Sequence, residues 1–233
     1  DPKIITDTSR YWIKAQEIIN KNGKINFFKT HNILGAINNI NFTNNKNTLG
    51  AIYIIRDPRN VITSLQNHYE LSSDEALKFM LNEKKYIFDP HVVNDYSDFQ
   101  FISSWERNYK SWKYQKEFPV KIVKYENLID DINLCFFEII KFINKITNNK
   151  EPIDLKKMNN SINSTSFKKL KEIEKNKGFL ESVKSKKKNS QIPFFNMGPK
   201  NDWKKILSED LKLKINNIFK KNLEELSYKS ERF

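Results

Sequence analysis

Lys29 and His31 stand two positions apart in the segment FFKTHN and are suited to moving a proton beside an anion. Alternate residues of an extended segment project to the same side, so both side chains can reach one site. A histidine with an ordinary pKa of about 6.5 accepts a proton at neutral pH, while an ammonium neutralises charge on a leaving oxygen. Taken alone the pair is a weak signal, because a Lys-x-His at a strand end is often incidental.

A second segment combines an arginine with the start of a helix. The apolar run AIYII ends at Arg56, and Asp57 and Pro58 follow as a helix N-cap and first helical residue. The guanidinium matches a phosphate group, and the helix start directs backbone N–H groups to the same region. Ser64, about two turns into the helix, adds a hydroxyl donor. The alternative is an ordinary ion pair between Arg56 and Asp57.

The elements that must position these residues alternate between helix and strand. Apolar periodicity and capping signals predict helices over 7–20, 58–69, 99–115, 131–146 and 208–226. A further helix is predicted to start at Ser72, which forms a capping box with Glu75. Strands are predicted over 25–29, 51–55 and 120–125. The region between the last two helices looks less regular. This order predicts an α/β fold with a mainly parallel sheet flanked by helices and a ligand site at the carboxyl ends of its strands.

Composition sets the broad class. The chain of 233 residues is 38% hydrophobic, which suits a single domain over 1–233. No apolar run has the length of a membrane span, and Cys135, the one cysteine, lies in an apolar stretch as a small buried residue, so we expect a cytoplasmic protein without a membrane span. His68 and His91 have no metal-ligand spacing around them, and we expect no metal.

Five motifs, in order along the chain, resemble the cytosolic-type sulfotransferase family. FFKTHN is similar to its Lys-Thr-His segment, and YIIRDPRNVITSLQNHY to its 3′-phosphate-binding strand and helix. The later stretches KIVKYENL, STSF and NMGPKNDW resemble its strand ending in Tyr-Glu, its adenine-contacting turn and its late glycine loop. The resemblance implies a P-loop NTPase-like sulfotransferase fold and transfer of a sulfuryl group from 3′-phosphoadenosine 5′-phosphosulfate to an acceptor hydroxyl or amine.

The same resemblance implies a role for each matching residue. His31 would act as general base toward the acceptor, and Lys29 would support the transferring sulfuryl group. The residues implied to bind the nucleotide are Arg56 and Ser64 at the 3′-phosphate, Tyr125, Thr165 and Phe167 around the adenine, and Gly198 in the late loop. Tyr125 and Phe167 could equally be core aromatic residues when considered singly.

Two features depart from the family. Its N-terminal phosphosulfate loop, a Lys-x-Gly-Thr-type turn, is absent from this sequence, so we expect an N-terminal piece to be missing, which would leave the isolated chain inactive. The late loop reads Asn196-Met197-Gly198, where the family carries Arg and Lys before the Gly. Lys200 or the run 186–188 are candidates to replace that charge.

Two other classes of function remain open. The wider P-loop class includes kinase-like nucleotide enzymes, and these hold magnesium at acidic strand ends, whereas the strand ends here are basic. A net charge of +13 also suits a nucleic-acid-binding module, although no binding motif supports it and a solvated lysine-rich surface explains the charge; we expect no nucleic-acid partner. The acceptor and the oligomeric state are not defined by these motifs, and the stretches 82–99 and 168–191 are the expected acceptor loops.

Overall fold

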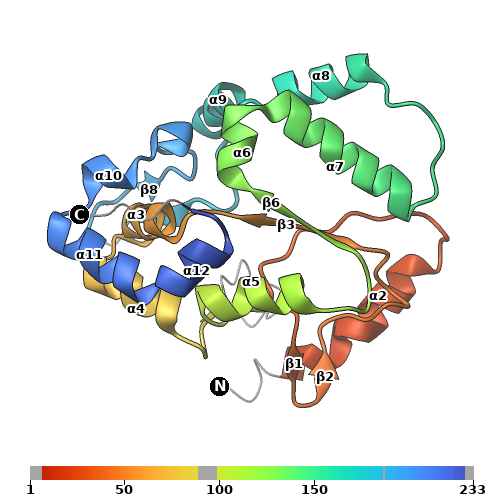
Figure 1. Cartoon of the computed structure of the whole chain (residues 1–233), viewed down its shortest axis with the longest axis horizontal. Coiled ribbons are helices and arrows are strands. Elements are labelled where there is room, and N and C mark those ends of the chain that lie inside the picture. The colour runs from red at the N-terminus through yellow and green to blue at the C-terminus, as the bar shows by residue number, and fades with distance from the viewer. Residues whose placement is uncertain (1–6, 89–98, 186, 229–233) are drawn as a thin grey trace. The chain divides into compact units, whose positions relative to one another are not determined.

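The computed structural model describes residues 7–88, 99–185 and 187–228, so His91 and Lys186 lie outside the described residues (Figure 1). The chain divides into two compact units, each built from separate stretches. Unit 1 comprises Asp1–Tyr53, Leu81–Ile122 and Lys145–Asn148, and unit 2 comprises Ile54–Met80, Val123–Asn144 and Asn149–Phe233. Whether 1–233 behaves as one domain stays a prediction.

Two of the predicted strands are present and pair with each other. They are β3 (Ala51–Ile55) and β6 (Val120–Lys124), and they run parallel. Each is followed directly by a helix in unit 2, α3 (Pro58–Tyr69) after β3 and α6 (Tyr125–Asp130) after β6. The predicted α/β fold class, with a parallel sheet and flanking helices, is confirmed.

The predicted starts of the two helices that follow β3 in sequence, at Pro58 and after Ser72, are correct. Asp57 caps α3 by accepting a hydrogen bond from the backbone N–H of Arg59, and Pro58 is the first helical residue. The capping box at the start of α4 (Ser73–Leu81) is also formed, because Glu75 accepts hydrogen bonds from both the backbone N–H and the hydroxyl of Ser72 at 2.7 Å. Local side-chain chemistry alone is sufficient to define these starts.

The expectation of irregular structure between residues 146 and 208 is wrong. After α7 (Ile132–Ile146), the region contains α8 (Leu155–Ser164), α9 (Phe167–Lys177), η2 (Gly198–Lys200) and α10 (Trp203–Ile206). The last two helices of the chain are α11 (Glu209–Ile218) and α12 (Lys220–Glu225). Charged and polar residues dominate α8 and α9, so only a few apolar residues mark the buried face of each helix, and Asp154 caps α8 through the N–H of Lys157. The helix predicted over 208–226 is broken at Phe219, which is buried in the core of unit 2.

Unit 1 corrects two further predictions. Its elements are η1 (Thr8–Tyr11), α2 (Trp12–Asn20), β1 (Ala36–Ile37), β2 (Ile40–Asn41), β4 (Tyr86–Ile87), β5 (Gln100–Phe101) and α5 (Trp105–Tyr114). The strand predicted over 25–29 is absent, because the segment pairs with no strand among the described residues and Phe27 is 73% exposed. The helix predicted from 99 begins only at Trp105, since Ser104 caps it and β5 pairs antiparallel with β4.

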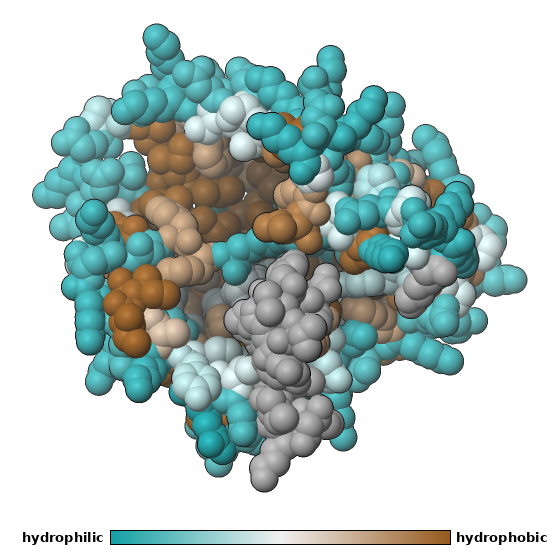
Figure 2. Space-filling model, turned by 180° about the vertical axis from the view of Figure 1, so that it is seen from behind, coloured by the Kyte–Doolittle hydropathy of each residue, from teal (hydrophilic) through white to brown (hydrophobic). Residues whose placement is uncertain are grey.

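The two remaining strands, β7 (Val183–Lys184) and β8 (Gln191–Ile192), form an antiparallel pair in unit 2. Helix α7 buries only Ile139, while Ile132 and Leu134 are exposed, and Figure 2 shows hydrophobic residues open at the surface around α7 and α8. Cys135 on this helix is half-buried rather than fully buried and forms no disulfide with a described residue. Within 7–88, 99–185 and 187–228, no helix combines the length and apolar character needed to cross a bilayer.

Candidate functional site

Arg56 follows β3 directly, and its guanidinium contacts neutral groups of unit 2. Nη1 donates to Ser64 Oγ at 3.3 Å, Nη2 donates to the carbonyl oxygen of Gly198 at 3.3 Å, and Cζ lies 4.4 Å from the centroid of the Tyr125 ring. Nε is buried and has no hydrogen-bond partner among the described residues. Burial lowers the pKa of Arg56, opposed by Tyr125, Glu126 and other neighbours, but an arginine with an ordinary pKa above about 12 stays charged.

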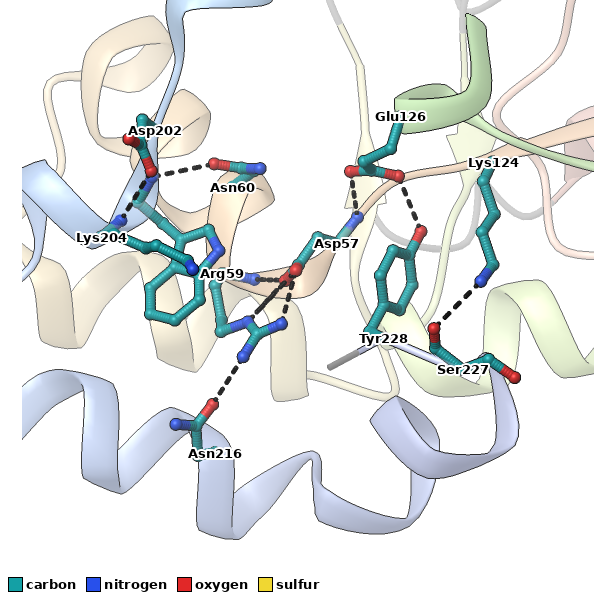
Figure 3. Close-up of polar contacts among 11 residues, drawn as sticks. Asp57, Arg59, Asn60, Lys124, Glu126, Asp202, Lys204, Asn216, Ser227 and Tyr228 are labelled. Atoms are coloured by element: carbon teal, nitrogen blue, oxygen red, sulfur yellow. Dashed lines mark hydrogen bonds and ion pairs between the residues drawn. The ribbon is translucent and has the colours of Figure 1, made fainter. Parts of the chain in front are cut away.

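The two acidic side chains that act electrostatically on Arg56, those of Asp57 and Glu126, are hydrogen-bonded to other groups (Figure 3). The carboxylate of Asp57 accepts hydrogen bonds from Arg59, with Arg59 Nη2 at 2.7 Å from Oδ2, and both side chains are buried. Glu126 accepts a hydrogen bond from the backbone N–H of Asp57 at 3.0 Å and another from the hydroxyl of Tyr228 at 3.0 Å. The simple ion pair between Arg56 and Asp57, the alternative left open by the sequence, is therefore not formed.

Arg59 has a structural role beside this site. Its Nη1 donates to Asn216 Oδ1 at 3.1 Å, and its Cζ lies 4.1 Å from the centroid of the Trp203 ring. The backbone N–H of Trp203 in turn donates to Asn60 Oδ1 at 3.0 Å, which joins α10 to α3 (Figure 3). Burial of Tyr228 raises the pKa of its hydroxyl, and the charge of Glu126 raises it further, so this phenol stays protonated. The two arginines thus differ: Arg59 has a carboxylate partner, whereas Arg56 forms no ion pair with any residue described.

Gly198 and Phe167 extend the surroundings of Arg56. Gly198 has a φ of +52°, and a Cβ built there would lie 2.2 Å from the Phe167 ring. The glycine therefore allows the late loop to approach the ring while its carbonyl oxygen accepts from Arg56. Four of the predicted nucleotide-binding residues therefore lie together in unit 2: Arg56, Ser64, Tyr125 and Gly198. Phe167 joins them through its contact with Gly198.

Thr165 has a different environment from the other predicted residues. It is exposed at the end of α8, and its hydroxyl donates to the carbonyl oxygen of Ser161 at 2.7 Å. It stands two residues before Phe167, which begins α9. The described contacts of Thr165 are thus with its own helix, and a role beside the adenine stays a prediction.

Lys29 and His31 belong to unit 1, and both side chains are exposed. The peptide of His31 is held from both sides: its N–H donates to Gln100 Oε1 at 2.5 Å, and its carbonyl oxygen accepts from Asn108 Nδ2 at 3.1 Å. The same Asn108 accepts a hydrogen bond from the hydroxyl of Tyr53 at 2.8 Å. Backbone anchoring by side chains, not strand pairing, positions this segment.

Asn32 strengthens that anchoring. It is 6% exposed, its Oδ1 accepts from the backbone N–H of Phe101 at 2.8 Å, and its carbonyl oxygen accepts from Trp112 Nε1 at 3.0 Å. Sequence reasoning missed Asn32, Gln100 and Asn108, and for Gln100 and Asn108 the polar residues among the aromatics of 99–115 were the available signal. No cluster of His, Cys, Asp or Glu suited to a metal occurs within the described parts of the chain.

The family of the chain follows from a direct comparison. A sequence model of the sulfotransferase domain matches residues 9–227, so the match covers nearly the whole chain. The chain belongs to the sulfotransferase family. The resemblance inferred from the five motifs is confirmed. The family match favours a sulfotransferase over the kinase-like and nucleic-acid-binding alternatives.

Among solved structures, the chain is similar to mouse sulfotransferase SULT7A1, determined in complex with PAP. The sequences are 17% identical, the match covers 74% of this chain and 58% of that one, and the TM-score is 0.48. The chain thus spans less than two thirds of the length of that sulfotransferase. No curated protein sequence matches the chain.

Proposed function

We propose that the chain binds the 3′-phosphoadenosine part of 3′-phosphoadenosine 5′-phosphosulfate in unit 2 and takes part in transfer of its sulfuryl group to an acceptor hydroxyl or amine. One observation supports this most: Arg56 is a half-buried cation without a carboxylate partner among the described residues, and its buried Nε has no acceptor. A phosphate oxygen would satisfy both the charge and the donor. Family membership supports the same donor.

Aromatic and hydroxyl groups around Arg56 suit the rest of the nucleotide. The Tyr125 ring lies against the guanidinium, and Phe167 lies against Gly198 on the late loop. Adenine stacks favourably on such rings. Ser64 adds a hydroxyl beside the proposed phosphate position.

The chemical step is assigned to the Lys-Thr-His segment of unit 1. His31 would take the proton of the acceptor as it attacks sulfur, and Lys29 would stabilise the charge that develops on the departing phosphate oxygen. Exposure of both side chains leaves them accessible to substrates, and their anchored backbone limits reorganisation.

Calorimetric titration tests the binding site directly. The chain is expected to bind adenosine 3′,5′-bisphosphate more tightly than adenosine 5′-monophosphate. Arg56→Ala should weaken the bisphosphate by roughly 10- to 100-fold, because a hydrogen-bonded charge contributes about 1.5–3 kcal/mol. Arg107→Ala, which removes an exposed arginine paired with Glu83, is the matched control and should have no effect. Equal affinity for the two nucleotides would refute the proposed 3′-phosphate site.

A further inference from the structure

Asn201 is a buried residue at the end of the late glycine loop, 7% exposed, just after η2. Its side chain makes three hydrogen bonds to helix α3. Nδ2 donates to the carbonyl oxygen of Asn60 at 3.0 Å and to Ser64 Oγ at 3.0 Å, and Oδ1 accepts from the Thr63 hydroxyl at 2.7 Å. These three hydrogen bonds fix the side chain of Asn201 against α3.

The partners of Asn201 determine which way its amide points. The carbonyl oxygen of Asn60 can only accept a hydrogen bond, so the nitrogen of the Asn201 amide must face it. The same nitrogen therefore faces Ser64, and the amide oxygen faces the Thr63 hydroxyl.

This orientation restricts the hydroxyl of Ser64. Its oxygen accepts from Asn201 Nδ2 at 3.0 Å and from Arg56 Nη1 at 3.3 Å, which occupies both lone pairs. The hydroxyl hydrogen must then point to a third group, and no residue that the structure describes accepts it. Beside a guanidinium with an unpartnered Nε, the acceptor with matching chemistry is an anionic oxygen.

We propose that Asn201 is a positioning residue of the 3′-phosphate site, which orients Ser64 so that its hydroxyl donates to the phosphate held by Arg56. The inference rests on the proposed nucleotide function. It also gives the late loop of this chain a role that does not require the Arg and Lys that the family carries before Gly198: the loop acts through an amide that controls a serine hydroxyl.

Asn201→Asp tests the orientation with almost no change in shape. A carboxylate would accept the hydroxyl hydrogen of Ser64 and withdraw it from the phosphate. The affinity for adenosine 3′,5′-bisphosphate should fall roughly 10- to 100-fold, while that for adenosine 5′-monophosphate should stay within about twofold. Asn201→Ala, which removes the donor without adding charge, should give an intermediate loss.

A double-mutant cycle separates positioning from a general structural role. In a Ser64→Ala background, Asn201→Ala should cause little further loss of bisphosphate affinity, because the hydroxyl that Asn201 orients is gone. Additive losses, or equal losses for both nucleotides, would overturn the proposal. Asn216→Asp places the same change beside Arg59 in the same unit and should leave both affinities unchanged.

Failure of the inference is distinguishable from failure of the proposed function. If Arg56→Ala weakens the bisphosphate but neither Asn201 variant does, the phosphate site stands and the positioning role of Asn201 is refuted. If the unchanged chain does not prefer the bisphosphate over the monophosphate, the proposed function itself is refuted. The midpoint of urea unfolding, measured for every variant, identifies any loss of affinity that comes from unfolding.

Discussion

The guanidinium of Arg56 lies over the ring of Tyr125, with 4.4 Å between Cζ and the ring centroid. These residues end two neighbouring strands, since Arg56 follows β3 and Tyr125 follows β6. The contact holds the charge of the guanidinium at the carboxyl end of the parallel pair, the edge where ligands bind in sheets of this kind. Strand pairing thus sets the position of the cation in the candidate site.

Replacement of Tyr125 should weaken nucleotide binding through both the ring and the arginine it supports. Tyr125→Leu is expected to lower the affinity for adenosine 3′,5′-bisphosphate roughly 5- to 30-fold, because a cation–π contact and base stacking each contribute about 1 kcal/mol or more. Tyr125→Phe keeps the ring and should bind within about threefold of the unchanged chain. Titration calorimetry measures both. Equal binding by the Leu and Phe variants would show that the ring makes no contribution.

Gly198→Ala should abolish nucleotide binding and destabilise unit 2. A Cβ at Gly198 would lie 2.2 Å from the Phe167 ring, and its φ of +52° is unfavourable for alanine. Gly178→Ala is the matched control, because Gly178 has a φ of +75° and a Cβ added there would meet no atom within 4 Å. The control should show only backbone strain, roughly 1–3 kcal/mol in urea unfolding, because its ψ of 177° also lies in a region that glycine alone favours. If both variants lose stability equally and still bind nucleotide, the contact with Phe167 has no role.

His31→Ala should abolish sulfuryl transfer without weakening nucleotide binding. His31 belongs to unit 1 and its side chain is exposed, whereas the proposed nucleotide contacts belong to unit 2. Loss of the general base is expected to lower kcat roughly 100-fold or more. The transfer assay uses a form of the protein that is active with phosphosulfate, and calorimetry measures bisphosphate affinity. Retained turnover would contradict the role assigned to His31.

Asn108→Leu provides a separate test of how that histidine is positioned. Asn108 donates to the carbonyl oxygen of His31 and accepts from the hydroxyl of Tyr53. The variant should lower kcat about tenfold with little change in the KM for phosphosulfate, and Asn108→Gln should recover part of the rate. Equal changes in kcat and KM, or no recovery by glutamine, would indicate a structural role alone.

Glu174 is expected to make the stability of unit 2 fall in acid. Its burial raises the pKa, but hydrogen bonds from Ser182 and from the backbone N–H groups of Phe194 and Phe195 outweigh burial and hold the pKa below its ordinary value of 4.5. A pKa lower in the folded than in the unfolded state gives stability that is present above pH 4.5 and is lost as pH falls through the folded pKa.

Urea unfolding between pH 7 and pH 3 checks this linkage. Glu174→Gln should be less stable than the unchanged chain at pH 7, and the difference should shrink toward pH 3, where the carboxylate of the unchanged chain becomes protonated. Glu172→Gln, an exposed glutamate on the same helix α9, is the control and should leave the pH profile unchanged. A difference that is independent of pH would contradict the role of the charge.

Local chemistry explains the parts of the fold that were predictable. Asp57 and Pro58 mark the start of α3, and Ser72 with Glu75 marks that of α4, because caps act over three or four residues. The hairpin β1–β2 was missed although it had a local signal: Asn38 and Asn39 both adopt positive φ in its two-residue turn, a conformation that asparagine tolerates.

Other features depend on partners far away in the sequence. Residues 25–29 have the composition of a strand, yet an extended segment becomes a strand only where another backbone pairs with it. The helices α8 and α9 contain few apolar residues, and each buries one residue, Met158 in α8 and Glu174 in α9, whose tertiary contacts stabilise it. Such contacts are not encoded in any short window of sequence.

The sequence by itself determined the family, the two strands 51–55 and 120–124 and the residue types of the candidate site, because each motif is a local pattern with its own spacing. Only the tertiary structure decided that Asp57 pairs with Arg59 and leaves Arg56 without a carboxylate, and that Asn201 reaches Ser64 across 137 positions of chain. The physical reason is that hydrogen-bond partners are chosen by distance in space, and the packing of the whole unit sets those distances.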